Sequence, residues 1–220
     1  MPDNGTDTGG SALQNFPLFD EYFSMVQTEI EGLSDEQLDW VSDKWGWSGW
    51  SIRNNISHVA SHLFRWYLFR WGDQLFPAGI PFKDEVQQMA GLPHRRLDED
   101  LWWEIEKILR KLDQALEMMR DILSKETLYT INEKTIEVEE SAAATYSRLA
   151  DENLGTLMQH PEDPSVWIMT LEGNLHHSQG EMVTHLYNVQ RLKLAQGLTK
   201  IVTLPKIGYW DLPDWDRSEP

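Results

Sequence analysis

The sequence predicts an all-α protein in which four long helices form one bundle. Four stretches are long enough for bundle helices, and their apolar residues recur at spacings of three and four. The chain has 220 residues and is 40% hydrophobic, which suits one domain with a substantial core. β-favouring residues gather in one short segment, residues 125–140, so we expect at most a small insert of sheet.

The first third of the chain predicts two bundle helices separated by a short turn of helix. The first helix is expected over residues 16–33, where six apolar residues keep helical spacing: Phe16, Phe19, Phe23, Val26, Ile30 and Leu33. Ser34, followed by two acidic residues, is typical of a helix N-cap and predicts a short helical turn. After a Gly- and Trp-rich loop, Ser51 opens the second long helix, which Gly72 and Pro77 bring to an end.

The remaining elements are predicted with less regular connections between them. Strict three–four spacing gives a third helix over residues 101–122, and a last helix is expected over 165–197. Between them, residues 125–140 predict a small hairpin or an extended loop, and residues 141–159 a short additional helix.

The two ends of the chain differ from this bundle in composition. Residues 1–11 are rich in Gly, Asp and Thr and are predicted to be disordered. The bundle domain is then expected over residues 12–197. A Pro-, Trp- and Asp-rich tail, residues 198–220, is expected to pack locally or onto a neighbouring molecule.

Charge and cysteine content exclude several classes of function. The formal net charge of −17 repels phosphate backbones, so we expect no nucleic-acid partner. No apolar run approaches the roughly 18 residues that span a bilayer, and the N-terminus lacks the features of a signal peptide. We therefore expect a cytoplasmic protein with no membrane partner. The absence of cysteine excludes thiolate ligands and a Cys nucleophile.

Residues 171–180, "LEGNLHHSQG", raise the question of which of two adjacent histidines faces the interior. A helix turns by about 100° per residue, so the last helix can be drawn as a wheel. Its apolar side is formed by Ile168, Leu171, Leu175, Met182, Leu186 and Val189. Glu172, His176 and Gln179 fall within that apolar arc, so the wheel predicts that His176 faces inward.

The opposite sector of the same wheel holds the other histidine. His177 lies there beside Glu181 and Asn188, and we expect it to meet water. His185 falls on the flank between the two sectors.

The inward pair of Glu172 and His176 offers ligands for a metal ion. A Glu and a His at i, i+4 share one face of a helix, and an ionised Glu on an apolar face is costly unless it is paired. His58 and His62 on the second helix have the same spacing, and a facing helix brings such residues together in bundles. His58, Glu172 and His176 would then form a 2-His-1-carboxylate site with open positions. The alternatives are a purely structural Glu–His hydrogen bond and, for His62, a core or pocket-edge role.

Two short motifs resemble those of the DinB-like (DinB/YfiT-type) four-helix-bundle metalloprotein superfamily. "WSIRNNISHVASH", with Trp50 to Arg53 ahead of His58, resembles the second-helix motif W-S-x-R that precedes a metal-binding His. "EGNLHHSQ" resembles the last-helix motif H-x-x-x-H-x-G-Q, with His176 on the last ligand and Gln179 on the trailing Gln. Glu172 stands where the family usually has His, as in the mycothiol-dependent maleylpyruvate isomerase branch. An alternative alignment, with His177 on the last ligand, loses the middle ligand and the Gln.

The resemblance implies an up-down-down-up bundle over roughly residues 12–197 and a divalent metal, for which the ligand types suit Zn, Ni, Fe or Mn. It also implies a metal-dependent enzyme, such as a transferase or isomerase that uses a low-molecular-weight thiol, or a hydrolase, acting on a small-molecule substrate. His62 and Gln179 would shape the pocket, while Arg53 or Arg65 would meet an anionic substrate or else be salt-bridged. The alternative function is a non-catalytic binding or stress-response module, and a homodimer is one possible assembly.

Overall fold

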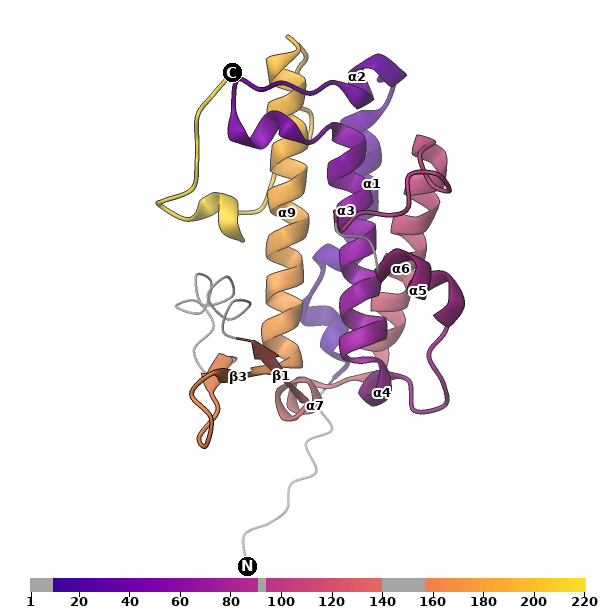
Figure 1. Ribbon diagram of the computed structural model, residues 1–220, viewed down its shortest axis with the longest axis vertical. Coiled ribbons are helices and arrows are strands. Elements are labelled where there is room, and N and C mark those ends of the chain that lie inside the picture. Colours follow the sequence, from indigo (N-terminus) through magenta and orange to yellow (C-terminus); the bar gives the residue numbers. More distant parts are fainter. Residues whose placement is uncertain (1–9, 91–93, 140–156) are drawn as a thin grey trace, which may run out of the picture.

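The computed structural model describes residues 10–90, 94–139 and 157–220. The described chain is mostly helical and carries one small three-stranded sheet (Figure 1). Most of the N-terminal segment predicted to be disordered, residues 1–9, lies outside this description. So does the greater part of the short helix predicted over residues 141–159.

Four long helices lie side by side and share the main core. They are α1 (Leu18–Ile30), α3 (Ile52–Phe64), α6 (Ile105–Lys125) and α9 (Leu171–Ala195). In Figure 1, α1 and α9 run upward, whereas α3 and α6 run downward. Helices α1 and α3 each contact both α6 and α9, so apolar side chains from all four helices meet in one cluster. The four predicted long helices are therefore present, although their ends differ from the predicted ones.

Shorter helical elements connect these four. They are η1 (Ala12–Asn15), α2 (Asp35–Asp39), η2 (Gly46–Gly49), η3 (Arg65–Arg70), α4 (Gly72–Leu75), α5 (Lys83–Ala90), α7 (Leu128–Glu133) and η5 (Tyr209–Asp211). The predicted cap of α2 is confirmed, since the Ser34 hydroxyl accepts a hydrogen bond from the Gln37 amide. Helix α3 continues into η3, which is a stretch of π-helix, so the predicted second helix does not keep α-helical register to its end.

The insert differs from the predicted hairpin. Residues 128–133 form α7, and β1 (Thr135–Glu139) pairs with β3 (Val166–Thr170), far along the sequence. A short strand β2 (Leu157–Gln159) pairs with the other edge of β3, so the antiparallel order is β1-β3-β2. The β-favouring run in β3 replaces the predicted first turns of the last helix. Helix α9 begins only after Thr170, whose hydroxyl caps it by accepting from the Gly173 amide.

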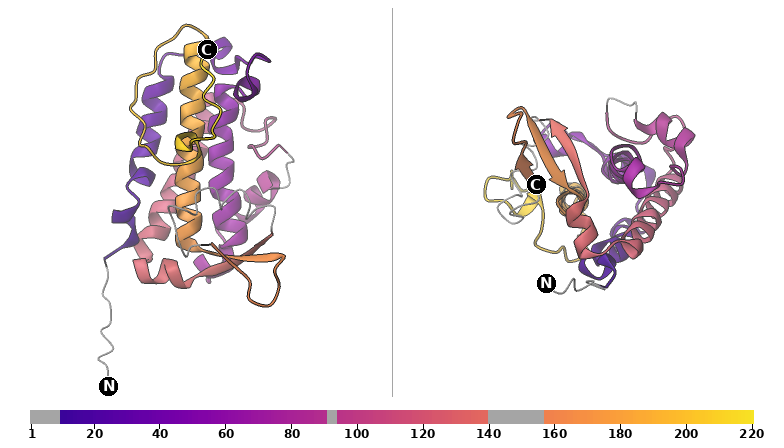
Figure 2. Two further views of the ribbon diagram at one scale, coloured as in Figure 1. Left: turned by 90° about the vertical axis from the view of Figure 1, so that its left-hand side faces the viewer. Right: turned by 90° about the horizontal axis from the view of Figure 1, so that it is seen from below.

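The C-terminal tail packs onto its own chain. It runs beside α9, where Figures 1 and 2 show it as a yellow strap. At its start, the buried carboxylate of Glu29 on α1 accepts hydrogen bonds from the amides of Ile201 and Val202. The same carboxylate pairs with Lys193 of α9 at 2.6 Å. The tail is therefore fixed to α1 by backbone hydrogen bonds to Glu29, and the buried ion pair of Glu29 with Lys193 joins α1 to α9 at the same point.

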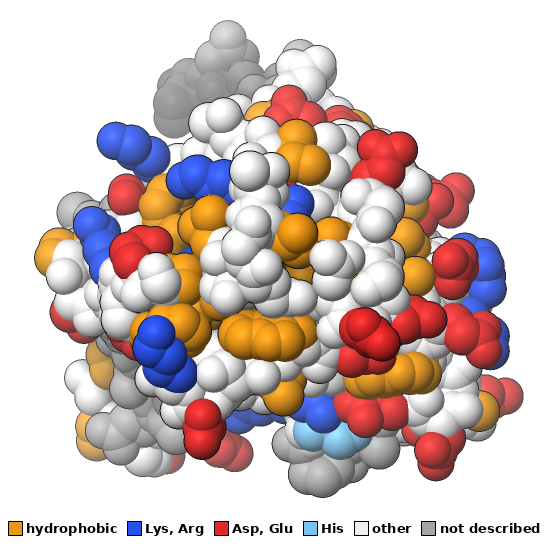
Figure 3. All heavy atoms as spheres, turned by 90° about the horizontal axis from the view of Figure 1, so that it is seen from above, with side chains coloured by type: hydrophobic (Ala, Val, Ile, Leu, Met, Phe, Trp, Pro, Cys, Tyr) orange, Lys and Arg blue, Asp and Glu red, His pale blue; other side chains and the backbone are white. Residues whose placement is uncertain are grey.

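Apolar and charged side chains alternate at the end of the molecule seen from above (Figure 3). In η2 and the residue before it, the rings of Trp45 and Trp47 stack at 5.0 Å. The guanidinium of Arg191 on α9 lies 4.1 Å from the Trp47 ring centroid.

Among the described residues, no helix has the combination of length and apolar character that crossing a lipid bilayer requires.

Candidate functional site

A stripe of polar side chains runs along the contact between α3 and α9. Helix α3 contributes His58 and His62, and α9 contributes His177, Glu181 and His185. Residues four apart lie one above the other on a helix face, so each helix presents its members as a column. Two columns that face each other across a helix contact can converge on one point.

Three members of this stripe could hold a metal ion. One ligand atom from each of His58, Glu181 and His185 can be chosen so that all three lie within 4.8 Å of one another. The carboxylate oxygen Oε2 of Glu181 is 3.6 Å from Nε2 of His58 and 3.3 Å from Nε2 of His185. Two imidazoles and one carboxylate are a common ligand set for divalent transition metals.

The protonation pattern of His58 is set by a backbone carbonyl. Its Nδ1 lies 2.9 Å from the carbonyl oxygen of Arg95, and a carbonyl oxygen can only accept a hydrogen bond. Nδ1 therefore carries the proton in the neutral ring, which leaves the lone pair of Nε2 directed toward Glu181. Metal-binding histidines are commonly oriented in this way by an acceptor on the other ring nitrogen.

His185 is oriented by a side-chain amide from α3. Its Nδ1 lies 2.8 Å from Oδ1 of Asn55. The amide nitrogen of Asn55 donates to the carbonyl oxygen of Ser51 at 2.8 Å, which fixes the amide so that Oδ1 faces the imidazole. His185 therefore donates from Nδ1, and in the neutral ring its Nε2 lone pair also faces Glu181.

These charges and lone pairs require a positive charge among them. Burial, together with the nearby His185, lowers the pKa of His58 to about 4, so His58 is neutral at pH 7. Burial raises the pKa of Glu181, but contacts with His185 and His58 outweigh this effect and hold it well below its usual value. An ionised carboxylate facing two Nε2 lone pairs is stable only when a proton or a cation lies between them.

A pocket of about 450 Å³ reaches this group. It is lined by Trp50, His58, His94, Arg95, Arg96, Glu181 and His185. The Trp50 ring stacks on His185, with 5.8 Å between ring centroids and 17° between planes. All three candidate ligands thus line a space of the size in which proteins bind small molecules.

A second set of buried groups lies along the stripe beyond the pocket. Nε2 of His62 lies 3.2 Å from the Ser178 hydroxyl, and Nδ1 of His177 lies 2.6 Å from the Tyr209 hydroxyl. Burial lowers the pKa of His177 to about 4 and that of His62 well below its usual value. Tyr209 reaches His177 because the preceding residue, Gly208, lets the tail backbone pass directly against Gly180 of α9. Gly208 has a φ of 87°, and a Cβ added to it would lie only 2.6 Å from Cα of Gly180.

The structure separates the predicted ligands. His58 lies in the group as predicted, but Glu172 and His176 are not brought to it. Glu172 is nine residues before Glu181, which corresponds to about 13 Å along a helix. The ring of His176 instead packs against Phe16, with 5.2 Å between centroids. Glu181 and His185 are therefore the residues of α9 that could complete a site with His58.

The two predicted pocket residues also lie outside the pocket lining. His62 is buried next to His58, with 6.1 Å between ring centroids, and contacts Ser178. Gln179 is buried as the wheel implied, but it does not line the pocket. The prediction that His177 meets water is wrong, because His177 is only 5% exposed.

The helical wheel failed because α9 has no single buried side. Helices α1 and α3, strand β3 and the C-terminal tail all contact α9, so its buried residues lie on every side of the helix. Examples are Asn174, Ser178, Gln179, Gly180, Met182, Val183, Thr184, Gln190 and Arg191. Hydrophobicity alone then cannot say which sector faces α3. A different signal was present, because His177, Glu181 and His185 repeat at four-residue steps, like His58 and His62.

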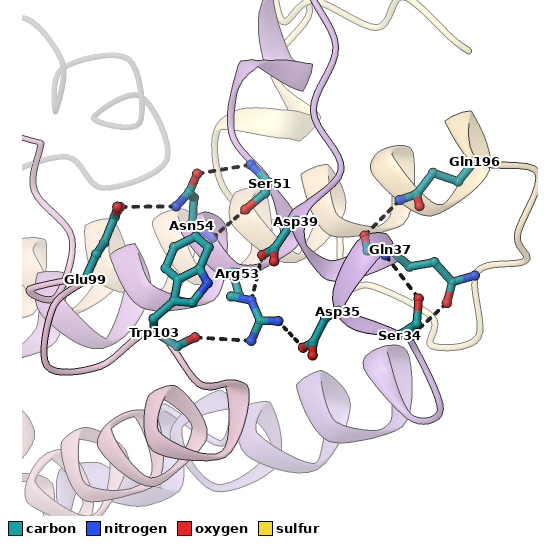
Figure 4. A network of polar contacts seen from close by, with 10 residues as sticks. All are labelled: Ser34, Asp35, Gln37, Asp39, Ser51, Arg53, Asn54, Glu99, Trp103 and Gln196. Carbon is teal, nitrogen blue, oxygen red and sulfur yellow. Dashed lines mark hydrogen bonds and ion pairs between the residues drawn. The ribbon is translucent and has the colours of Figure 1, made fainter.

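The W-S-x-R stretch, residues 50–53, fixes the start of α3 and supplies none of the three candidate ligands. The Ser51 hydroxyl caps α3 by accepting from the Asn54 amide at 3.2 Å (Figure 4). The Arg53 guanidinium donates to Asp39 at 2.6 Å, to Asp35, and to the Trp103 carbonyl at 3.1 Å. Arg53 therefore joins α2, the start of α3 and the loop before α6, so its role is the salt-bridged one.

Comparison of the chain with protein-family models, with curated proteins and with solved structures finds no match. The geometry of the site is therefore what indicates the function of this chain. Of the two motifs, the stretch ending at His58 leads to the site, whereas Glu172 and His176 of the other lie away from it.

Proposed function

We propose that this chain is a DinB-like four-helix-bundle protein that binds one divalent cation through His58, Glu181 and His185. The observation that carries the proposal is the convergence of two Nε2 lone pairs and one carboxylate, with both Nδ1 atoms committed to fixed acceptors. A structural ion pair needs no such preparation of both rings. A metal site needs it, because the ligand nitrogens must be unprotonated.

The arrangement of the long helices supports the same assignment. Two helices run up and two run down, in the order up, down, down, up along the chain (Figure 1). The candidate ligands come from α3 and α9, which contact each other, and their side chains project between these helices. Metal sites of helical bundles are built in this manner from inward-facing side chains.

The ligand types restrict the metal and its chemistry. Two neutral imidazoles and one carboxylate suit Zn, Fe, Mn or Ni, and three protein ligands leave positions open for a further molecule. A cation with an open position lowers the pKa of a bound water or thiol and polarises a carbonyl group. We therefore propose metal-dependent transfer, isomerisation or hydrolysis of a small molecule, with a low-molecular-weight thiol as a candidate co-substrate.

Metal content and affinity test this proposal. Elemental analysis of the purified protein should find about one divalent ion per chain. Calorimetric titration of the chelator-treated protein with zinc, manganese and nickel should show one site. His58→Ala should abolish it, whereas His176→Ala, on the same helix as two of the ligands, should bind metal as the wild type does.

The opposite outcome favours a non-catalytic bundle. A wild-type protein that contains no stoichiometric metal, and whose thermal stability does not increase with any of the three ions, would contradict the proposal. Equal loss of metal in His58→Ala and His176→Ala would contradict the ligand assignment.

A further inference from the structure

The walls of the pocket carry charge of the opposite sign to the rest of the molecule. Three consecutive residues, His94, Arg95 and Arg96, line it together with the candidate ligands, and among the described lining residues Glu181 is the one carboxylate. The whole chain has a formal net charge of −17. A local group of guanidinium side chains at the pocket therefore marks a place where an anion is favoured over its surroundings.

The two arginines differ in how their charges are compensated. Nε and Nη2 of Arg96 both donate to Oε1 of Glu99, at 2.9 and 2.7 Å, and its guanidinium lies over the Trp50 ring. Arg95 is exposed, and no acidic side chain of the described residues pairs with it. Arg95 therefore supplies a guanidinium that remains available to a ligand.

The backbone of Arg95 connects this guanidinium to the candidate metal site. Its φ is 59°, in the left-handed region that residues with a Cβ seldom adopt. In this conformation its carbonyl oxygen accepts from Nδ1 of His58 at 2.9 Å and from Nη2 of Arg65 at 3.3 Å. The residue that orients a candidate ligand through its carbonyl oxygen therefore also lines the pocket and carries an exposed guanidinium.

Trp50 gives the pocket a flat apolar wall. Its ring stacks on His185 and lies 5.1 Å from the His58 ring, measured between centroids. A planar ligand could lie against the part of this indole that lines the pocket beside Arg96 and His185, while its charged end meets Arg95. A carboxylate matches the planar fork of a guanidinium and forms two parallel hydrogen bonds with it.

We infer that the pocket binds a small carboxylic acid with a planar or aromatic body, whose carboxylate is held by Arg95 and whose body lies along Trp50. This inference deepens the proposed function, because the far end of such a molecule would face the cation site. It names the chemical class of the substrate and the residue that selects it.

Benzoate and benzamide form a matched pair of probes for this inference, since they share a planar body and differ in charge. Calorimetric titrations should detect benzoate binding and at least about tenfold weaker binding of benzamide. Arg95→Gln should weaken benzoate binding at least about tenfold. Arg110→Gln, which removes an exposed arginine of α6 outside the pocket, should leave it within about twofold of the wild type.

Each titration is made with metal-loaded and with metal-free protein, and zinc affinity is measured for every variant. Unchanged zinc affinity in Arg95→Gln shows that its fold and candidate ligands are intact. If no metal binds, the proposed function fails, while benzoate binding that depends on Arg95 in the metal-free protein still supports the inference. Equal binding of benzoate and benzamide, or of benzoate by Arg95→Gln and the wild type, would overturn it. Tighter binding of inorganic phosphate than of benzoate would overturn the choice of a carboxylate.

Discussion

Helix α9 carries two Glu–His pairs with the same spacing and different surroundings. Glu172 and His176 lie toward its start, where both are half-buried and His176 packs against Phe16. Glu181 and His185 lie two and a half turns further on and face His58 of α3. Spacing places each pair on one face of the helix, but among the described residues the second pair is the one that a third candidate ligand, His58, joins. The environment across the helix contact therefore distinguishes a candidate site from an ordinary pair.

Replacing the glutamate of each pair by glutamine should give the greatest difference in zinc affinity between variants. Glu181→Gln should lower zinc affinity by more than the roughly hundredfold that loss of an outer hydrogen-bond partner costs, because it removes a charged ligand. Glu172→Gln should leave zinc affinity within about twofold of the wild type. Competition with a chromophoric chelator measures both values, and equal effects in the two variants would remove the distinction between the pairs.

The histidine next to His176, His177, should make the stability of the protein depend on pH. Burial lowers the pKa of His177 to about 4, against about 6.5 in an unfolded chain, so the folded state binds fewer protons between these values. Its contribution to stability is fully present above pH 6.5 and is lost as the pH falls toward 4, by at most about 3 kcal/mol. Urea unfolding of the metal-free protein at pH 7 and pH 4.5 should show a larger loss for the wild type than for His177→Gln. Identical losses would mean that His177 is not buried in its neutral form.

The acceptor behind His185 accounts for a smaller share of metal affinity. Asn55→Ala removes the oxygen that accepts from Nδ1 of His185, and should lower zinc affinity by about ten- to a hundredfold. Asn54→Ala is the matched control from the same turn. It removes a partner of the Ser51 cap and should lower the free energy of unfolding by about 1 kcal/mol without changing zinc affinity. A reversed pattern would show that the amide of Asn55 serves only the fold.

The smallest effect is expected at the tail. Tyr209→Phe removes the hydroxyl that lies 2.6 Å from Nδ1 of His177, and should lower the free energy of unfolding by about 1 kcal/mol. Tyr129→Phe changes a residue that is 60% exposed and should have no measurable effect. Urea unfolding of the two variants would contradict the role of the tail if their stabilities were equal.

Local patterns in the sequence predicted the helices well. Apolar spacing located the four long helices, and Ser34 and Ser51 marked the starts of α2 and α3, because periodicity and capping depend on residues close in the chain. The pairing of β1 with β3 was missed, since it joins segments about thirty residues apart. Short apolar runs such as 166–170 fit a strand or a buried helix equally well.

The candidate site was predicted in kind and in one of its residues. A 2-His-1-carboxylate set between the second and the last helix was expected, and His58 lies in the observed group. The choice of Glu172 over Glu181 depended on which side of α9 was taken as inward. The C-terminal tail, residues 198–220, buries the His177 side of α9 by placing Tyr209 against His177. The packing of this tail could not be predicted from the sequence.

Anomalous diffraction from crystals grown with zinc would locate the bound ion itself. One strong peak is expected about 2.0–2.2 Å from Nε2 of His58, Nε2 of His185 and Oε2 of Glu181. A peak bound by Glu172 and His176, or a fully zinc-saturated crystal with no peak between α3 and α9, would contradict it.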